Sequence, residues 1–154
     1  MTDQVPTIDE IDSAEKLSEH LKSQPSLLSR IIAARNGLRA FPVFLNSLDS
    51  YPLSARQKKI LFNSTFHAVL IFLAFCEDAK FDVKLSVSTA IRNLKDSEKL
   101  LLKRSPALHS MLRSLDAIAN PDSAHFFVGR SIHSLSQEKL LSSKDIIFQE
   151  SLND

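Results

Sequence analysis

Apolar and polar positions repeat with a helical period through most of this chain. The longest such stretch runs from Ser54 to Cys76, and no Gly or Pro interrupts it. Ser54 follows a proline and supplies an oxygen that can cap a helix N-terminus. One apolar stripe follows helical spacing and consists of Phe62, Phe66, Val69, Leu73 and Cys76. The other sides are filled by Ile60, Ala68, Ile71, Phe72 and Phe75. A helix that is apolar nearly all round is a buried one, so residues 54–76 are predicted to be the central helix of the domain.

A second periodic stretch comes before it in the chain. Its apolar residues follow alternating spacings of four and three: Leu27, Ile31, Ala34, Leu38, Phe41, Leu45 and Leu48. This pattern is typical of a helix packed along a neighbour through a narrow seam. Pro42 lies inside the stretch and removes a backbone donor, so we expect a kink or a break near Ala40 and Phe41. The helix is then expected to bend around residues 54–76.

The rest of the chain predicts shorter helices and no sheet. Helical periods cover residues 12–24, 83–94 and 106–119, and a last helix begins near Asp122 or Ser123. The chain has only two glycines, whereas the tight turns of a many-stranded fold need positive φ angles. The predicted fold is therefore all-α, a single-domain irregular bundle of about six helices around the central one. We expect a loosely packed acidic segment (1–24), the bundle domain (25–140) and a C-terminal tail (141–154).

The composition favours a cytoplasmic protein. The only cysteine, Cys76, cannot form an internal disulfide and is expected to be buried. The N-terminus is acidic and polar, unlike a signal peptide. The apolar run from Ile60 to Cys76 is shorter than the roughly 20 residues that span a bilayer, and its first half is partly polar. A core helix is therefore favoured over a membrane span.

Charge is distributed unevenly, although the net charge is only +1. Residues 1–24 are mostly acidic, and residues 25–75 are mostly basic. Two explanations stay open: the acidic segment folds back over the basic one, or the basic residues bind RNA or another anionic partner. The candidate binding residues are Arg35, Arg39, Arg56 and Lys59. A fifth candidate is His67, which forms a polar notch with Asn63 and Ser64 on an otherwise apolar helix.

Most catalytic and cofactor motifs are absent from the sequence. The five histidines do not occur at the spacing of a zinc site, so no metal is predicted. Two glycines are too few for a phosphate-binding loop, and no cofactor is predicted. Cys76 has no neighbouring histidine that would activate a thiolate.

One short motif resembles a known family. Arg104-Ser-Pro-Ala-Leu-His109 is similar to the arginine and histidine motif of HEPN-type ribonucleases, which are small all-α domains. The resemblance covers six residues and implies that Arg104 and His109 act together on the RNA backbone, usually across a dimer. Pro106 departs from the family pattern, because it places Arg104 before a new helix and His109 inside it.

Two functions of different class follow from these observations. The favoured one is an intracellular helical interaction or regulatory domain without catalysis, with another protein as its partner and a homodimer as one form. The alternative is a HEPN-like ribonuclease that uses Arg104 and His109. The alternative requires both side chains to converge in a cleft, which is expected to lie near the two-fold axis of a dimer.

Overall fold

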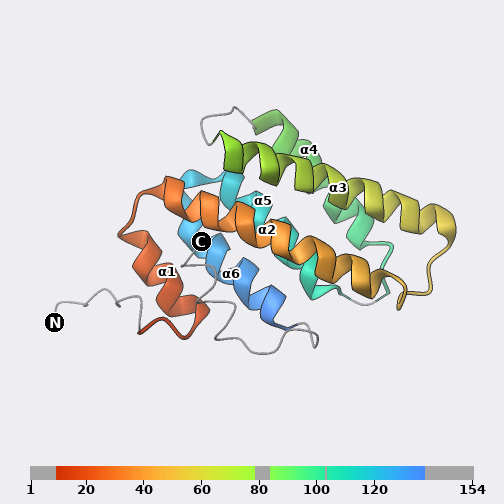
Figure 1. Ribbon diagram of the computed structural model, residues 1–154, viewed down its shortest axis with the longest axis horizontal. Coiled ribbons are helices and arrows are strands. Elements are labelled where there is room, and N and C mark those ends of the chain that lie inside the picture. The colour runs from red at the N-terminus through yellow and green to blue at the C-terminus, as the bar shows by residue number, and fades with distance from the viewer. Residues whose placement is uncertain (1–9, 79–83, 103, 138–154) are drawn as a thin grey trace.

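The computed structural model describes residues 10–78, 84–102 and 104–137, and these form an all-α bundle (Figure 1). The bundle contains α1 (Ala14–Lys22), α2 (Ser26–Leu48), α3 (Ala55–Glu77), α4 (Lys84–Glu98), α5 (Pro106–Ala119) and α6 (Ala124–Ser136). A single 3₁₀ turn, η2 (Pro121–Ser123), leads into α6. The described part of the chain contains no strand, so the predicted all-α fold with six helices is confirmed.

Side-chain hydrogen bonds cap the N-termini of α3 and α5. The Ser54 hydroxyl accepts from the backbone N–H of Gln57, and the Gln57 side chain accepts from the backbone N–H of Ser54. This reciprocal pair is a capping box. At α5, the Ser105 hydroxyl accepts from the backbone N–H of Leu108, while Pro106 occupies the first helical position, where its missing N–H is not needed.

The central helix of the bundle is α5. It packs against α2 and α6 most extensively, and against α4. Figure 1 shows it behind α2, with α3 and α4 to one side and α6 and α1 to the other. Nine of its 14 residues are buried: Ala107, Leu108, Ser110, Met111, Leu112, Ser114, Leu115, Ala117 and Ile118. The core of the domain therefore surrounds α5.

The expected central position of residues 54–76 is wrong. They form α3, but this helix lies at the edge of the bundle and packs mainly against α2 and α4. Phe62, Phe66 and Leu73 of the predicted buried stripe are 41–46% exposed, and Cys76 is exposed as well. The opposite face is buried instead: Leu61, Thr65, Ala68, Val69, Ile71, Phe72 and Phe75. Because α3 is apolar on all sides, its periodicity did not indicate which side faces the core.

Helix α2 continues through Pro42 without the predicted break. The predicted seam residues are half-buried, except for Ala34, which is buried, and Leu27, which is exposed. The most buried positions lie beside the seam and are mostly small: Ser29, Ile32, Ala33, Ala34, Asn36, Gly37, Ala40 and Phe44. Small side chains allow α5 and α6 to approach the backbone of α2 closely. This buried face therefore lacks the large apolar residues that would have identified it in the sequence.

Helix α1 belongs to the bundle. Leu17 and Leu21 are fully buried, and they join Val128 and Ile132 of α6 in a second apolar cluster. The expectation of loose packing is therefore wrong for α1, which packs mainly on α6 and makes fewer contacts with basic α2. Residues 1–9 of the predicted acidic segment, and the predicted tail at 141–154, lie outside the described residues.

A buried polar network joins the three helices at the centre. The Asn36 side-chain amide of α2 donates to Ser110 of α5 at 3.1 Å and to Ser131 of α6 at 2.5 Å. Ser131 also lies 2.8 Å from the hydroxyl of Ser114. All four side chains are buried, so each hydrogen bond replaces one that water would otherwise provide. The network fixes the register of α2 against α5 and α6.

Replacing Asn36 by Ala should therefore lower the free energy of unfolding by about 2–3 kcal/mol. The hydroxyls of Ser110 and Ser131 lose their donor, and the truncation leaves a small cavity. Urea denaturation followed by circular dichroism measures the change. Asn63→Ala, at an exposed position of α3, is the matched control and should stay within about 0.5 kcal/mol of the parent.

Candidate functional site

A cleft of about 480 Å³ opens where the start of α5 meets α1 and α6. Two arginines and two histidines line it, against a single acidic side chain, Glu15. Arg104 and His109 come from the start of α5, and Arg130 and His133 come from α6. The described walls of the cleft are therefore basic, which suits an anionic ligand.

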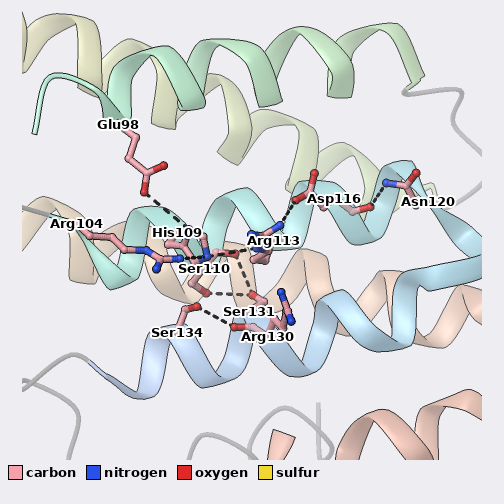
Figure 2. Close-up of polar contacts among 10 residues, drawn as sticks. All are labelled: Glu98, Arg104, His109, Ser110, Arg113, Asp116, Asn120, Arg130, Ser131 and Ser134. Carbon is pink, nitrogen blue, oxygen red and sulfur yellow. Dashed lines mark hydrogen bonds and ion pairs between the residues drawn. The ribbon is translucent and has the colours of Figure 1, made fainter. Parts of the chain in front are cut away.

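The structure brings Arg104 and His109 into direct contact, as Figure 2 shows. The guanidinium Nη2 of Arg104 contacts the imidazole Nε2 of His109. The contact follows from the way α5 begins. Ser105 is the N-cap, so Arg104 lies just outside the helix, and the backbone N–H of His109 donates to the Ser105 carbonyl in the first turn. Pro106 begins the helix and does not separate the pair.

Two further charged groups surround the imidazole of His109. Nε of Arg113, one turn further along α5, donates to Nε2 of His109 at 3.3 Å. On the other side, a carboxylate oxygen of Glu98, the last residue of α4, lies 3.8 Å from Nδ1 (Figure 2). This distance is too long for a hydrogen bond, so the attraction between Glu98 and the ring is electrostatic.

The protonation state of His109 follows from its neighbours. Arg104 and Arg113 carry only donors, so Nε2 must present a lone pair to them. The ring proton of the neutral imidazole is therefore assigned to Nδ1, which is buried and faces Glu98. The Nε2 lone pair is occupied by the two guanidinium groups, so His109 can accept a proton from a substrate only after Arg104 moves away from it.

The same cluster perturbs Glu98. The interaction with His109 holds the pKa of Glu98 below its ordinary value, partial burial opposes the shift, and the charges of Arg104 and Arg113 add smaller contributions. A carboxylate with a lowered pKa stabilises the fold fully above its unfolded value of 4.5, and that contribution disappears as the pH falls through the folded-state pKa.

Glu98→Gln should therefore lower the melting temperature at pH 7 by roughly 1–4 °C. The expected effect is small because the Glu98–His109 pair is partly exposed to solvent, which screens the attraction. The difference from the parent should shrink steadily between about pH 5 and pH 3 as the carboxylate of the parent protonates. Differential scanning calorimetry over that range measures it. Glu19→Gln changes an exposed carboxylate of α1 and serves as the control. An equal difference at every pH would contradict the assignment.

The candidate basic residues do not form one surface. Arg56 and Lys59 lie in the first turns of α3. Arg35 lies near Cys76, which is in the last turn of α3. Partial burial raises the pKa of the Cys76 thiol, and the positive charge of Arg35 opposes this rise. Twenty residues of helix separate Arg56 from Cys76, or about 30 Å. Arg39 is half-buried on α2, one turn from Arg35.

The His67 notch is divided as well. His67 is half-buried on α3 and does not line the cleft. Asn63 is exposed, whereas Ser64 bonds to Ser97 of α4 at 2.8 Å.

Four residues of the site were not among the sequence candidates: Glu98, Arg113, Arg130 and His133. Arg113 had a usable signal, since it follows His109 by four residues and so lies on the same face of a helix. Arg130 and His133 are three residues apart on α6, but nothing in the sequence indicated that α6 faces the start of α5.

No protein-family model matches the chain, no curated protein matches its sequence, and no solved structure matches its fold. Any function therefore has to be argued from the residues of the cleft.

Proposed function

We propose that this protein is a HEPN-like ribonuclease whose active site is the cleft at the start of α5. The single observation that carries the proposal is the direct contact of Arg104 with His109 inside a basic cleft. A spacing of five residues does not by itself bring two side chains together across a helix start, so the contact is additional support for the motif. The resemblance implies such a convergence, although it also implies that the cleft lies near the two-fold axis of a dimer.

His109 acts as the general base of the proposed reaction. Its Nε2 takes the proton of a ribose 2′-hydroxyl, and the 2′-oxygen attacks the adjacent phosphorus. Glu98 stabilises the imidazolium that forms, because its carboxylate lies beside Nδ1. Arg104 is exposed, so it moves from Nε2 to the phosphate as the substrate enters the cleft.

The remaining cations complete the reaction. Arg104 and Arg130 hold the non-bridging phosphate oxygens and stabilise the charge of the phosphorane. His133, in its protonated form, gives a proton to the 5′-oxygen as the P–O bond breaks. The products are a 2′,3′-cyclic phosphate and a free 5′-hydroxyl, and no water or metal takes part in this step.

The test is cleavage of a labelled single-stranded RNA by the purified full chain in the presence of EDTA. The expected products end in 2′,3′-cyclic phosphate, which mass spectrometry identifies. A matched oligonucleotide with 2′-deoxyribose at every position should remain intact, because it lacks the nucleophile. Products with a 5′-phosphate, or cleavage of the deoxy strand, would overturn the mechanism.

A second candidate is the interaction domain without catalysis. It is supported by the outward face of α3, where Phe62, Phe66, Leu70 and Leu73 are exposed. Large exposed apolar groups in one patch are typical of protein interaction sites. The RNA assay separates the two candidates, since a pure interaction domain leaves the labelled RNA intact.

A further inference from the structure

The outward face of α3 carries an apolar stripe with opposite charges at its two ends. The stripe consists of Phe62, Phe66, Leu70 and Leu73, spaced by four, four and three residues and 41–50% exposed. On the same face, Lys59 precedes the stripe by one turn and Glu77 follows it by one turn. Both are exposed, and neither forms an ion pair with another residue in the described ranges.

The stripe is ordered although no described element covers it. The rings of Phe62 and Phe66 are stacked with centroids 5.8 Å apart, and Phe41 of α2 lies against Phe62 at 6.3 Å. The other face of α3 is held on α2 and α4 by Phe72 and Phe75, both fully buried. Helix α3 lies at the edge of the bundle (Figure 1), and its outward face therefore exposes a fixed row of apolar side chains.

The order of residues along the stripe suits a second copy of the same helix running in the opposite direction. If Phe66 faces Leu70 of a second copy, the antiparallel register places Phe62 near Leu73 of that copy. The same register places Lys59 opposite Glu77, and by symmetry this happens at both ends. An interface that matches itself after a two-fold rotation is the commonest form of protein dimer.

We propose that this protein forms a two-fold dimer in which α3 pairs antiparallel with α3 of a second copy. The two aromatic and two leucine side chains from each chain form the apolar centre, and two Lys59–Glu77 pairs close the ends. The pairing does not depend on the proposed ribonuclease. The cleft is formed by α1, α5 and α6, and α3 packs mainly on α2 and α4, so both clefts remain accessible in the dimer.

A lipid bilayer fits the same face less well. Among the described helices, α3 is the one whose length and composition would allow it to cross a membrane. However, 39% of its apolar window is buried against the rest of the fold, and insertion would strip that face from α2 and α4. A lipid surface would also offer no partner of opposite sign for both Lys59 and Glu77, whereas a second copy offers one for each.

Light scattering after gel filtration of the full chain tests the proposal. The parent should elute with twice the monomer mass of 17.2 kDa, and Phe66→Glu or Leu70→Glu should elute as a monomer with unchanged circular dichroism. Leu85→Glu is the matched control, because Leu85 is 83% exposed on α4 and is not part of the stripe, and it should remain dimeric. A monomeric parent over an approximately hundredfold range of concentration would overturn the proposal.

Charge exchange tests the direction of pairing. Lys59→Glu and Glu77→Lys should each weaken the dimer by roughly tenfold, because each places like charges together twice. The double exchange restores both pairs and should return the dissociation constant to near the parent value. A parallel pairing would place Lys59 against Lys59 and Glu77 against Glu77, so neither single exchange would weaken the dimer, and that result would also overturn the proposal. Failure of that recovery, or binding of the parent to phosphatidylcholine vesicles in place of dimerisation, would overturn the proposal.

Discussion

Replacement of His109 by Ala is expected to lower the rate of RNA cleavage by about 10²–10⁴-fold, the usual contribution of a positioned general base. The imidazole is the one group in the described cleft with its lone pair held between two arginines and its second nitrogen facing a carboxylate. Without it, the 2′-hydroxyl has no acceptor for its proton. The rate is measured under single-turnover conditions, so that changes in RNA affinity do not enter it.

Two further variants separate chemistry from folding. His109→Asn keeps an acceptor for Arg104 and Arg113 but cannot take up a proton, so it should fold normally and be as inactive as His109→Ala. His125→Ala removes a half-buried histidine of α6 that does not line the cleft, and it should retain full activity. Full activity in His109→Ala would indicate a contaminating ribonuclease, and equal losses in His125→Ala and His109→Ala would indicate a general effect on stability. Either result would contradict the assignment.

The role of Arg104 can be distinguished from simple electrostatic attraction. Arg104→Lys keeps the positive charge but loses the planar fork that holds two phosphate oxygens at once. The single-turnover rate should therefore fall while RNA affinity changes little, because Arg130 and the retained charge still attract the backbone. A loss of affinity with an unchanged rate would assign Arg104 to binding alone.

The fold class could be predicted from the sequence because helix starts and periods are local properties. Ser54 caps α3, and Pro106 begins α5, as the sequence indicates. The position of α3 could not be predicted in the same way. Its apolar residues cover all sides, and an apolar helix at an interface has the same composition as an apolar helix in a core.

The candidate site was predicted only in part, for a related reason. Arg104 and His109 belong to one local motif, so the sequence alone indicated that they lie near each other. Only the geometry of the helix start, which brings the two side chains into contact, came from the structure. Glu98 reaches the ring of His109 from α4, and Arg130 reaches the cleft from α6, so their positions depend on how those helices pack on α5. The packing of α6 on α5 is set partly by Asn36, which bonds to both helices and carries no hydrophobic signal.

Gly37 shows how closely α2 and α3 approach one another. A Cβ atom built on Gly37 would overlap the ring of Phe72 from α3. That ring is fully buried and cannot swing into solvent. Elsewhere in a helix interior, replacing glycine by alanine stabilises by about 1 kcal/mol, since alanine loses less backbone entropy on folding. At Gly37 the gain in helix propensity and the overlap with Phe72 oppose each other, and the overlap determines the sign of the change in the free energy of unfolding.

Gly37→Ala is therefore expected to lower the free energy of unfolding by about 1–3 kcal/mol in the parent, because overpacking exceeds the gain in helix propensity. In a Phe72→Leu background the ring is absent, and the same substitution should instead stabilise by about 0.5–1 kcal/mol.

Gly129→Ala is the matched control. Its Cβ would lie 2.6 Å from the carbonyl oxygen of Ala14, a backbone atom that Phe72→Leu does not move, so it should destabilise equally in both backgrounds. Urea denaturation of the parent, the two single variants and the double variant measures the coupling free energy between Gly37→Ala and Phe72→Leu. A Gly37→Ala effect of the same sign in both backgrounds would show that Phe72 does not set the packing distance between α2 and α3.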